Sequence, residues 1–179
     1  MILYTVGHGV RSTDELVAVL RAAGVERLVD VRRFPGSRRN PHLSREALAA
    51  DLPLAYEWWG EELGGRRSRP KDRPTRHPAW RNEAFQAYAD YMDTEPFRTA
   101  LQRLLAEADA DHTATAVMCA ETVWWRCHRR LIADAAVSQG AEVVHLLDVG
   151  TTQPHKASDG LRIDDDGWPV YDLGPQTIL

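Results

Sequence analysis

Cysteine is scarce in this sequence, and long apolar runs are missing. Two cysteines in 179 residues cannot build the disulfide framework of a small secreted protein. No run of about eighteen apolar residues occurs, and the first residues lack a basic region followed by an apolar stretch. We therefore expect neither a membrane span nor a secretory signal, and we expect a cytoplasmic protein without a membrane partner.

An excess of positive charge is also missing. Lysine and arginine number 22 against 26 aspartates and glutamates, which gives a net charge of −4 and does not favour indiscriminate nucleic-acid binding. The basic residues are concentrated in residues 30–39 (DVRRFPGSRR) and 64–76 (GGRRSRPKDRPTR), whereas residues 159–172 are acidic. Two basic loops indicate an anionic ligand, although a solvated surface explains either loop alone equally well.

Alternating strands and helices indicate an α/β fold. Short apolar, β-rich runs predict strands at residues 2–6, 26–31, 54–59, 112–120 and 141–147. Helices are predicted after the capping residues Ser12, Ser44, Asn82 and Thr94, and over residues 127–140. We therefore predict a single α/β domain over residues 1–148, with a mainly parallel Rossmann-like sheet of about five strands and helices on both faces. Residues 149–179 form an acidic tail, for which a small hairpin packed on the domain is one arrangement.

Reactive and charged residues follow the predicted strands at their carboxyl ends. In parallel α/β sheets these ends meet at one edge, where ligands bind. The residues at this edge are His8; Asp30, Arg32, Arg33 and Ser37; Glu57, Glu61 and Glu62; Cys119 and Glu121; and His145 and Asp148. Each residue alone has a simple structural explanation, but their coincidence on five strands predicts a site.

An ordered series of motifs carries a family resemblance. The motifs are TVGHGVRS, VDVRRFPGSRRNP, ELGG, YADYM, MCAE and WRCHR. This series, spread over residues 3–147, resembles that of the bacterial domain of unknown function 488 family. The resemblance implies an enzyme but no particular reaction. Many relatives read Gly-His-Ser where this chain has Gly7, His8 and Gly9, so a hydroxyl in that motif is absent or is supplied by Ser12.

The two cysteines are the candidate nucleophiles. Cys119 ends a strand, the position used by phosphate-binding nucleophilic cysteines, but the nearest arginine in register, Arg126, comes one residue too late for that motif. Cys127 lies near the start of a helix beside His128 and Arg129, where positive charge and the helix dipole favour a thiolate. For each thiol, an inert buried cysteine is the alternative.

A metal site is disfavoured by the sequence pattern. The spacing Cys-x7-Cys-His, which ends at Cys127 and His128, is not a recognised zinc motif. Adjacent side chains are also expected to point in different directions on a helix. We therefore predict no metal and no cofactor. Convergence of His8 with Cys119 and Glu121 at neighbouring strand ends is the alternative that would create a transition-metal site.

Glu121, Asp30 and His8 are the acid–base candidates. The sequence does not decide whether the neighbouring tryptophans raise the pKa of a carboxyl at Glu121 or nearby arginines lower it. Asp30 could instead form an ion pair with Arg32 that organises the loop. A structural hydrogen bond is the alternative role for His8.

The remaining candidates are binding residues. Arg32, Arg33 and Arg129 suit recognition of a phosphate or carboxylate group. Trp125 belongs to one of two tryptophan pairs beside the predicted site, where an aromatic ring can stack a nucleic-acid base or simply pack in the core. The full predicted substrate-binding set is Arg32, Arg33, Ser37, Glu62, Trp125, Cys127, His128 and Arg129.

These observations favour an enzyme that acts on an anionic small molecule or nucleotide. No Gly-x-Gly-x-x-Gly fingerprint follows the first strand, so hydrolysis or group transfer is favoured over hydride transfer. Cys119 or Glu121 would carry the chemistry, with His8 and Asp30 assisting. The alternatives are a non-catalytic module that binds a nucleotide or nucleic acid, and a thiol redox switch or metal-binding protein that uses Cys119 and Cys127.

Overall fold

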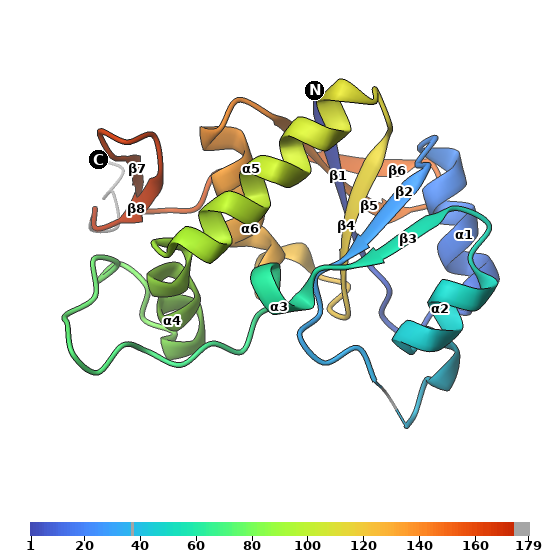
Figure 1. The fold of residues 1–179 in the computed structure, drawn as a ribbon, viewed down its shortest axis with the longest axis horizontal. Coiled ribbons are helices and arrows are strands. Elements are labelled where there is room, and N and C mark those ends of the chain that lie inside the picture. The colour runs from blue at the N-terminus through green and yellow to red at the C-terminus, as the bar shows by residue number, and fades with distance from the viewer. Residues whose placement is uncertain (37, 174–179) are drawn as a thin grey trace.

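The computed structural model describes residues 1–36 and 38–173 and contains a central six-stranded sheet (Figure 1). The strands are β1 (Ile2–Gly7), β2 (Arg27–Asp30), β3 (Ala55–Trp58), β4 (Thr115–Cys119), β5 (Glu142–Asp148) and β6 (Thr151–Pro154). Their order is β3-β2-β4-β1-β5-β6, and all neighbours are parallel except β5 and β6. The predicted fold class, with five parallel strands at the predicted places, is therefore confirmed.

Helices connect these strands and begin where the capping residues predict. The helices are α1 (Thr13–Ala22), α2 (Arg45–Asp51), α3 (Gly60–Leu63), α4 (Glu83–Met92), α5 (Glu95–Ala110) and α6 (Arg129–Ser138), with short 3₁₀ turns η1 (Pro41–Leu43) and η2 (Trp124–Arg126). Ser12 forms a reciprocal capping box with Glu15, and the side chain of Asn82 accepts hydrogen bonds from two amides of the first turn of α4.

The sheet separates two apolar cores. On β4, Val117 and Cys119 face the core that contains α4, α5 and α6, whereas Ala116 and Met118 face the core that contains α1 and α2. This alternation follows from the two-residue period of a strand. Cys119 therefore points to the same side of the sheet as α6, the helix that immediately follows Cys127 and His128.

The connections after β1 and β4 leave the sheet in opposite directions. β1 leads to α1 on one face, and the neighbouring strand β4 leads to α6 on the other face. Ligands in open α/β sheets bind at such a change of direction, outside the carboxyl ends of the strands. The backbones of the two loops also meet, since the amide of His8 donates to the carbonyl of Cys119 at 3.0 Å.

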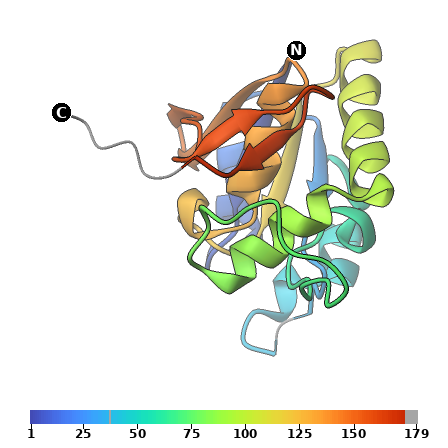
Figure 2. The ribbon, with the colours of Figure 1, turned by 90° about the vertical axis from the view of Figure 1, so that its left-hand side faces the viewer.

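The C-terminal segment adds a sixth strand to the central sheet and a hairpin to the domain. β6, which lies within the segment that the sequence assigned to the tail, joins β5 in an antiparallel pair. β7 (Leu161–Ile163) and β8 (Pro169–Tyr171) form a separate antiparallel pair, which Figure 2 shows as the red hairpin. Trp168 and Tyr171 of this hairpin are buried in the core that contains α6. Among the described residues, none of the helices combines the length and the apolar character that crossing a membrane requires.

Candidate active site

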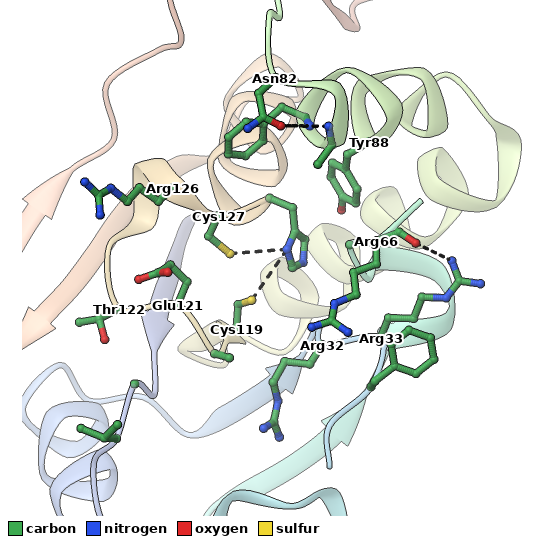
Figure 3. A pocket seen from close by; sticks show the side chains of 18 residues that line it. Arg32, Arg33, Arg66, Asn82, Tyr88, Cys119, Glu121, Thr122, Arg126 and Cys127 are labelled. Carbon is green, nitrogen blue, oxygen red and sulfur yellow. Dashed lines mark hydrogen bonds between the residues drawn. The ribbon is translucent and has the colours of Figure 1, made fainter. Parts of the chain in front are cut away.

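A pocket of about 670 Å³ lies over the carboxyl ends of β1, β2 and β4. Its walls come from the loops after these strands, from Gly65 and Arg66 after α3, and from the start of α4 (Figure 3). Six residues of the predicted set line it, namely Arg32, Arg33, Cys119, Glu121, Cys127 and His128. The carboxyl-end location that the sequence predicts and the pocket in the structure therefore coincide.

Two thiols and an imidazole form a compact cluster at this pocket. The Nδ1 atom of His128 lies 3.5 Å from Sγ of Cys127 and 3.8 Å from Sγ of Cys119. Figure 3 shows both sulfurs turned toward the same point between the walls of the pocket. The expectation that Cys127 and His128 diverge is wrong, because α6 begins only at Arg129 and the backbone of Cys127 is extended.

The environment of the two thiols differs although they are neighbours. The hydrogen bond to Cys127, together with burial, raises the pKa of Cys119 to about 12. The same hydrogen bond, assisted by the positive charge of Arg129, lowers the pKa of Cys127 to about 7 against the opposing effect of burial. Cys127 is therefore the more acidic thiol of the pair, and Cys119 is the donor of the hydrogen bond between the two sulfurs.

A glycine without a side chain and a buried arginine hold the loop between β4 and η2 against β1. A Cβ atom at Gly7 would lie 2.0 Å from the carbonyl oxygen of Glu121, so only glycine allows this approach. Arg129 is buried and donates from Nη2 to the carbonyl oxygens of Glu121 at 2.6 Å and Thr122 at 3.3 Å. Arg129 thus fixes the loop that carries Glu121, and it does not line the pocket.

Beneath the pocket, Asp30 and Arg32 form a buried ion pair. Nη2 of Arg32 lies 2.5 Å from Oδ2 of Asp30, and this carboxylate also accepts hydrogen bonds from the hydroxyl of Tyr56 and from the amide of Arg32. Nη1 of Arg32 lies 2.9 Å from Nε2 of His8 and donates to the carbonyl of Leu43. Asp30 and His8 are fully or almost fully buried, and neither lines the pocket.

The contact between His8 and Arg32 also indicates the protonation state of the histidine. Burial, reinforced by the charge of Arg32, lowers the pKa of His8 to about 4. The neutral imidazole can then accept from the guanidinium through Nε2, while Nδ1 faces the carbonyl oxygen of Gly9 at 2.9 Å. His8 therefore orients Arg32 from below the pocket.

Three arginines and one exposed phenylalanine surround the entrance of the pocket. Arg33, Arg66 and Arg126 come from three different loops. The side chain of Phe34 is 64% exposed and lies close to the guanidinium groups of Arg33 and Arg66, which are 5.8 and 5.9 Å from the ring centroid. Arg66 adopts a φ of 57°, which is uncommon for a residue other than glycine.

Besides Arg129, two predicted binding residues do not line the pocket. Glu62 borders a separate depression between α3 and α5, and Trp125 is 48% exposed but does not line the pocket. Ser37 lies outside the described residues. Other residues line the pocket that the sequence did not predict, among them Phe34, Gly65, Arg66 and Tyr88. Phe34 and Arg66 are within the basic loops that were identified, but nothing in their spacing distinguishes them from solvated loop residues.

The fold and the pocket define a parallel α/β protein with a polar site at its strand ends. Residues 12–136 match the family model described as Domain of unknown function DUF488. The chain therefore belongs to this family, which confirms the resemblance carried by its motifs. No curated protein and no solved structure matched the chain.

Proposed function

We propose that this protein is an enzyme that hydrolyses an anionic substrate or transfers a group from it. The observation that carries the proposal is the combination, in one pocket, of a thiol pair, an imidazole and an arginine-rich entrance. An anion-binding entrance and a reactive floor are what such chemistry requires. A phosphate or carboxylate group, alone or as part of a nucleotide, is the chemical class that fits these side chains.

The charge of the entrance supports an anionic ligand. Among the described residues, Arg33, Arg66 and Arg126 have no carboxylate within ion-pair distance, whereas the buried Arg32 is already paired with Asp30. Glu121 is the acidic residue on the same wall, and one of its carboxylate oxygens accepts a hydrogen bond from the amide of Val123. The positive side chains therefore outnumber the negative one at the entrance, which favours entry of an anion.

The reactive groups come from the segment between β4 and α6. Cys119 and Cys127 supply sulfur as a nucleophile or as a ligand, and the carboxylate of Glu121 supplies proton transfer at the solvent-exposed side of the pocket. His8 and Asp30 act through Arg32, so we assign them a positioning role. Arg129 has a comparable role, because it holds the carbonyl of Glu121.

A non-catalytic nucleotide-binding or nucleic-acid-binding module is the second candidate. The exposed ring of Phe34, close to two guanidinium groups, is the observation that favours it. Such a ring offers a surface on which a base can stack while arginines contact phosphate. In this case the same residues bind the ligand but leave it chemically unchanged.

The test is a substrate panel with untagged, full-length protein. Phosphomonoesters, phosphodiesters, nucleoside phosphates and carboxylic esters would be incubated with the protein, and products would be identified by mass spectrometry and phosphorus NMR. We expect saturable turnover of an anionic member. Cys119→Ala and Glu121→Gln should keep the circular dichroism spectrum of the parent and lose turnover by about 100-fold or more. Arg162→Ala is the control, because Arg162 is exposed on the distant hairpin and pairs with Asp172.

Two results would count against the enzyme. Unchanged turnover in both variants would remove the assigned roles of Cys119 and Glu121. A ligand of the panel that binds with a steep loss of affinity at high salt, but is recovered unaltered, would favour the binding module instead.

A further inference from the structure

We propose that Cys119, Cys127 and His128 bind a transition-metal ion, with zinc as the expected metal, and leave one coordination position open to the pocket. The two sulfurs and one ring nitrogen of His128 lie within 4.8 Å of one another. They come from the end of β4 and from the residues immediately before α6. A set of two thiolates and one imidazole favours zinc over magnesium or calcium, which prefer oxygen ligands.

The two sulfur–nitrogen distances fit a tetrahedral ion. Zinc bonds of about 2.3 Å to sulfur and about 2.0–2.1 Å to nitrogen place a sulfur and a nitrogen about 3.5 Å apart at tetrahedral angles. The distances from Nδ1 of His128 are 3.5 Å to Cys127 and 3.8 Å to Cys119. The two sulfur–nitrogen edges of the tetrahedron therefore have lengths close to those that a zinc ion requires.

The orientation of His128 supports the same conclusion. Its Nε2 atom lies 3.1 Å from the carbonyl oxygen of Val31, so the ring proton is on Nε2 and Nδ1 presents its lone pair to the two sulfurs. A histidine that binds a metal through one nitrogen commonly donates from the other to a carbonyl or carboxylate. Gly65 covers the ring, since a Cβ atom there would lie 2.9 Å from Nδ1.

A divalent ion also satisfies the charge balance of the site. Cys119 and Cys127 are 8% and 5% exposed, and two thiolates in such surroundings require positive charge. A divalent ion neutralises both thiolates when each thiol loses its proton to solvent, so binding releases two protons for each ion bound when both thiols start protonated. The ion needs no oxidant or reductant, because zinc has no redox chemistry in proteins.

The open position gives the metal a chemical role within the proposed function. All three ligating residues line the pocket, so a water on the fourth position would face the same space as the entrance arginines and Glu121. A bound metal lowers the pKa of such a water and makes it a nucleophile. This catalytic consequence rests on the proposed function, whereas metal binding itself does not.

The test is titration of metal-depleted, untagged protein with cobalt(II), which occupies zinc sites and reports its ligands by absorption. We expect about one equivalent per chain, a sulfur-to-cobalt charge-transfer band, the visible bands of a tetrahedral ion, and loss of all three on addition of zinc. Cys119→Ser, Cys127→Ser and His128→Asn should each weaken binding by about 100-fold or more. His112→Asn is the matched control, because His112 is exposed and outside the cluster.

The outcomes separate this proposal from the proposed function. Less than about a tenth of an equivalent at saturation, or a cobalt spectrum without the sulfur band, would overturn the metal site. Equal binding by the parent and all three variants would do the same, since the ion would then sit elsewhere. If a variant fails to fold, the spectrum and stoichiometry of the parent decide the question. Anion binding measured on the metal-depleted protein tests the entrance arginines independently, so one proposal can fail while the other holds.

Discussion

Sγ of Cys127 lies 3.5 Å from Nδ1 of His128, the next residue in the chain. Successive side chains on a helix point about 100° apart, so this contact requires a break in helical geometry. The break is present because Cys127 has φ −126° and ψ 152° and α6 begins two residues later. The transition from extended chain to helix therefore brings sulfur and imidazole together, and Cys119 completes the cluster from β4.

Gly65→Ala should weaken metal binding without removing a ligand. The added methyl group would lie 2.9 Å from Nδ1 of His128, so the ring or the loop must shift. We expect the affinity for cobalt(II) to fall by about 10-fold or more, as is typical when the support of a ligating histidine is disturbed. Gly36→Ala is the control, because a Cβ atom there meets nothing within 4 Å. Equal affinities for the two variants would show that Gly65 does not position the imidazole.

Asp30→Asn should destabilise the fold rather than act only on turnover. The carboxylate is fully buried and accepts from Arg32 and from the hydroxyl of Tyr56, so the substitution leaves a buried guanidinium without its counter-charge. We expect a loss of about 3–5 kcal/mol in the free energy of unfolding, measured by urea denaturation. Glu107→Gln removes a partly exposed partner of Arg27 and should cost no more than about 1 kcal/mol. A fully stable Asp30→Asn variant with abolished turnover would instead indicate direct participation in chemistry.

The sequence was sufficient to predict the sheet because its signals are local. Each parallel strand is a short apolar run, and the helix starts at Ser12, Ser44 and Asn82 are marked by side chains that cap them. The antiparallel strand β6 was missed because Thr151–Pro154 has polar residues and a proline. Its position at the edge of the sheet explains this composition, since edge strands bury little and tolerate proline.

The site was predictable as a location but only partly as a set of residues. The carboxyl ends of parallel strands share an edge, so Cys119, Glu121 and Arg33 could be grouped from topology alone. The direction of a side chain depends on the backbone dihedral angles and the rotamer, which the sequence does not give, and this is why the cluster of Cys127 and His128 was not predicted. The burial of His8 likewise depends on residues that are distant in sequence, such as Arg32 and Cys119, which no spacing in the sequence records.

The stability of the fold should fall in mildly acidic solution. Burial lowers the pKa of His145 to about 3, with help from the charges of His155 and Arg129, and burial together with Arg32 lowers the pKa of His8 to about 4. In the unfolded chain both histidines titrate near pH 6.5. The unfolded chain therefore binds more protons between these values, so stability is complete above pH 6.5 and declines as the pH falls.

The decline can be measured as the slope of the free energy of unfolding between pH 7 and pH 4.5. Each histidine contributes up to about 1.4 kcal/mol per pH unit in this range. His145→Gln should remove the contribution of one group, whereas the exposed His112→Asn should leave the slope as in the parent. A His145→Gln protein with the parental slope would mean that His145 binds its proton equally well in both states.

The exposed ring of Phe34 distinguishes a nucleotide from a simple anion. If a base stacks on this ring, Phe34→Ala should weaken the binding of adenosine monophosphate by about 5- to 150-fold, the range expected for loss of one stacking contact. The same variant should bind inorganic phosphate as the parent does, because phosphate makes no contact with a ring. Calorimetric titration of both ligands at one fixed salt concentration measures the two affinities directly.

Arg33→Gln should affect both ligands, in contrast to Phe34→Ala. Its guanidinium lies at the entrance without a carboxylate partner among the described residues, so its removal should weaken both ligands in parallel. Ile163→Ala is the control for loss of an exposed apolar side chain, since Ile163 lies on the separate hairpin and is 45% exposed. If Phe34→Ala, like Arg33→Gln, weakens the binding of adenosine monophosphate and of inorganic phosphate by the same factor, the ring does not contact a base. The arginines at the entrance would then recognise the ligand through its anionic group alone.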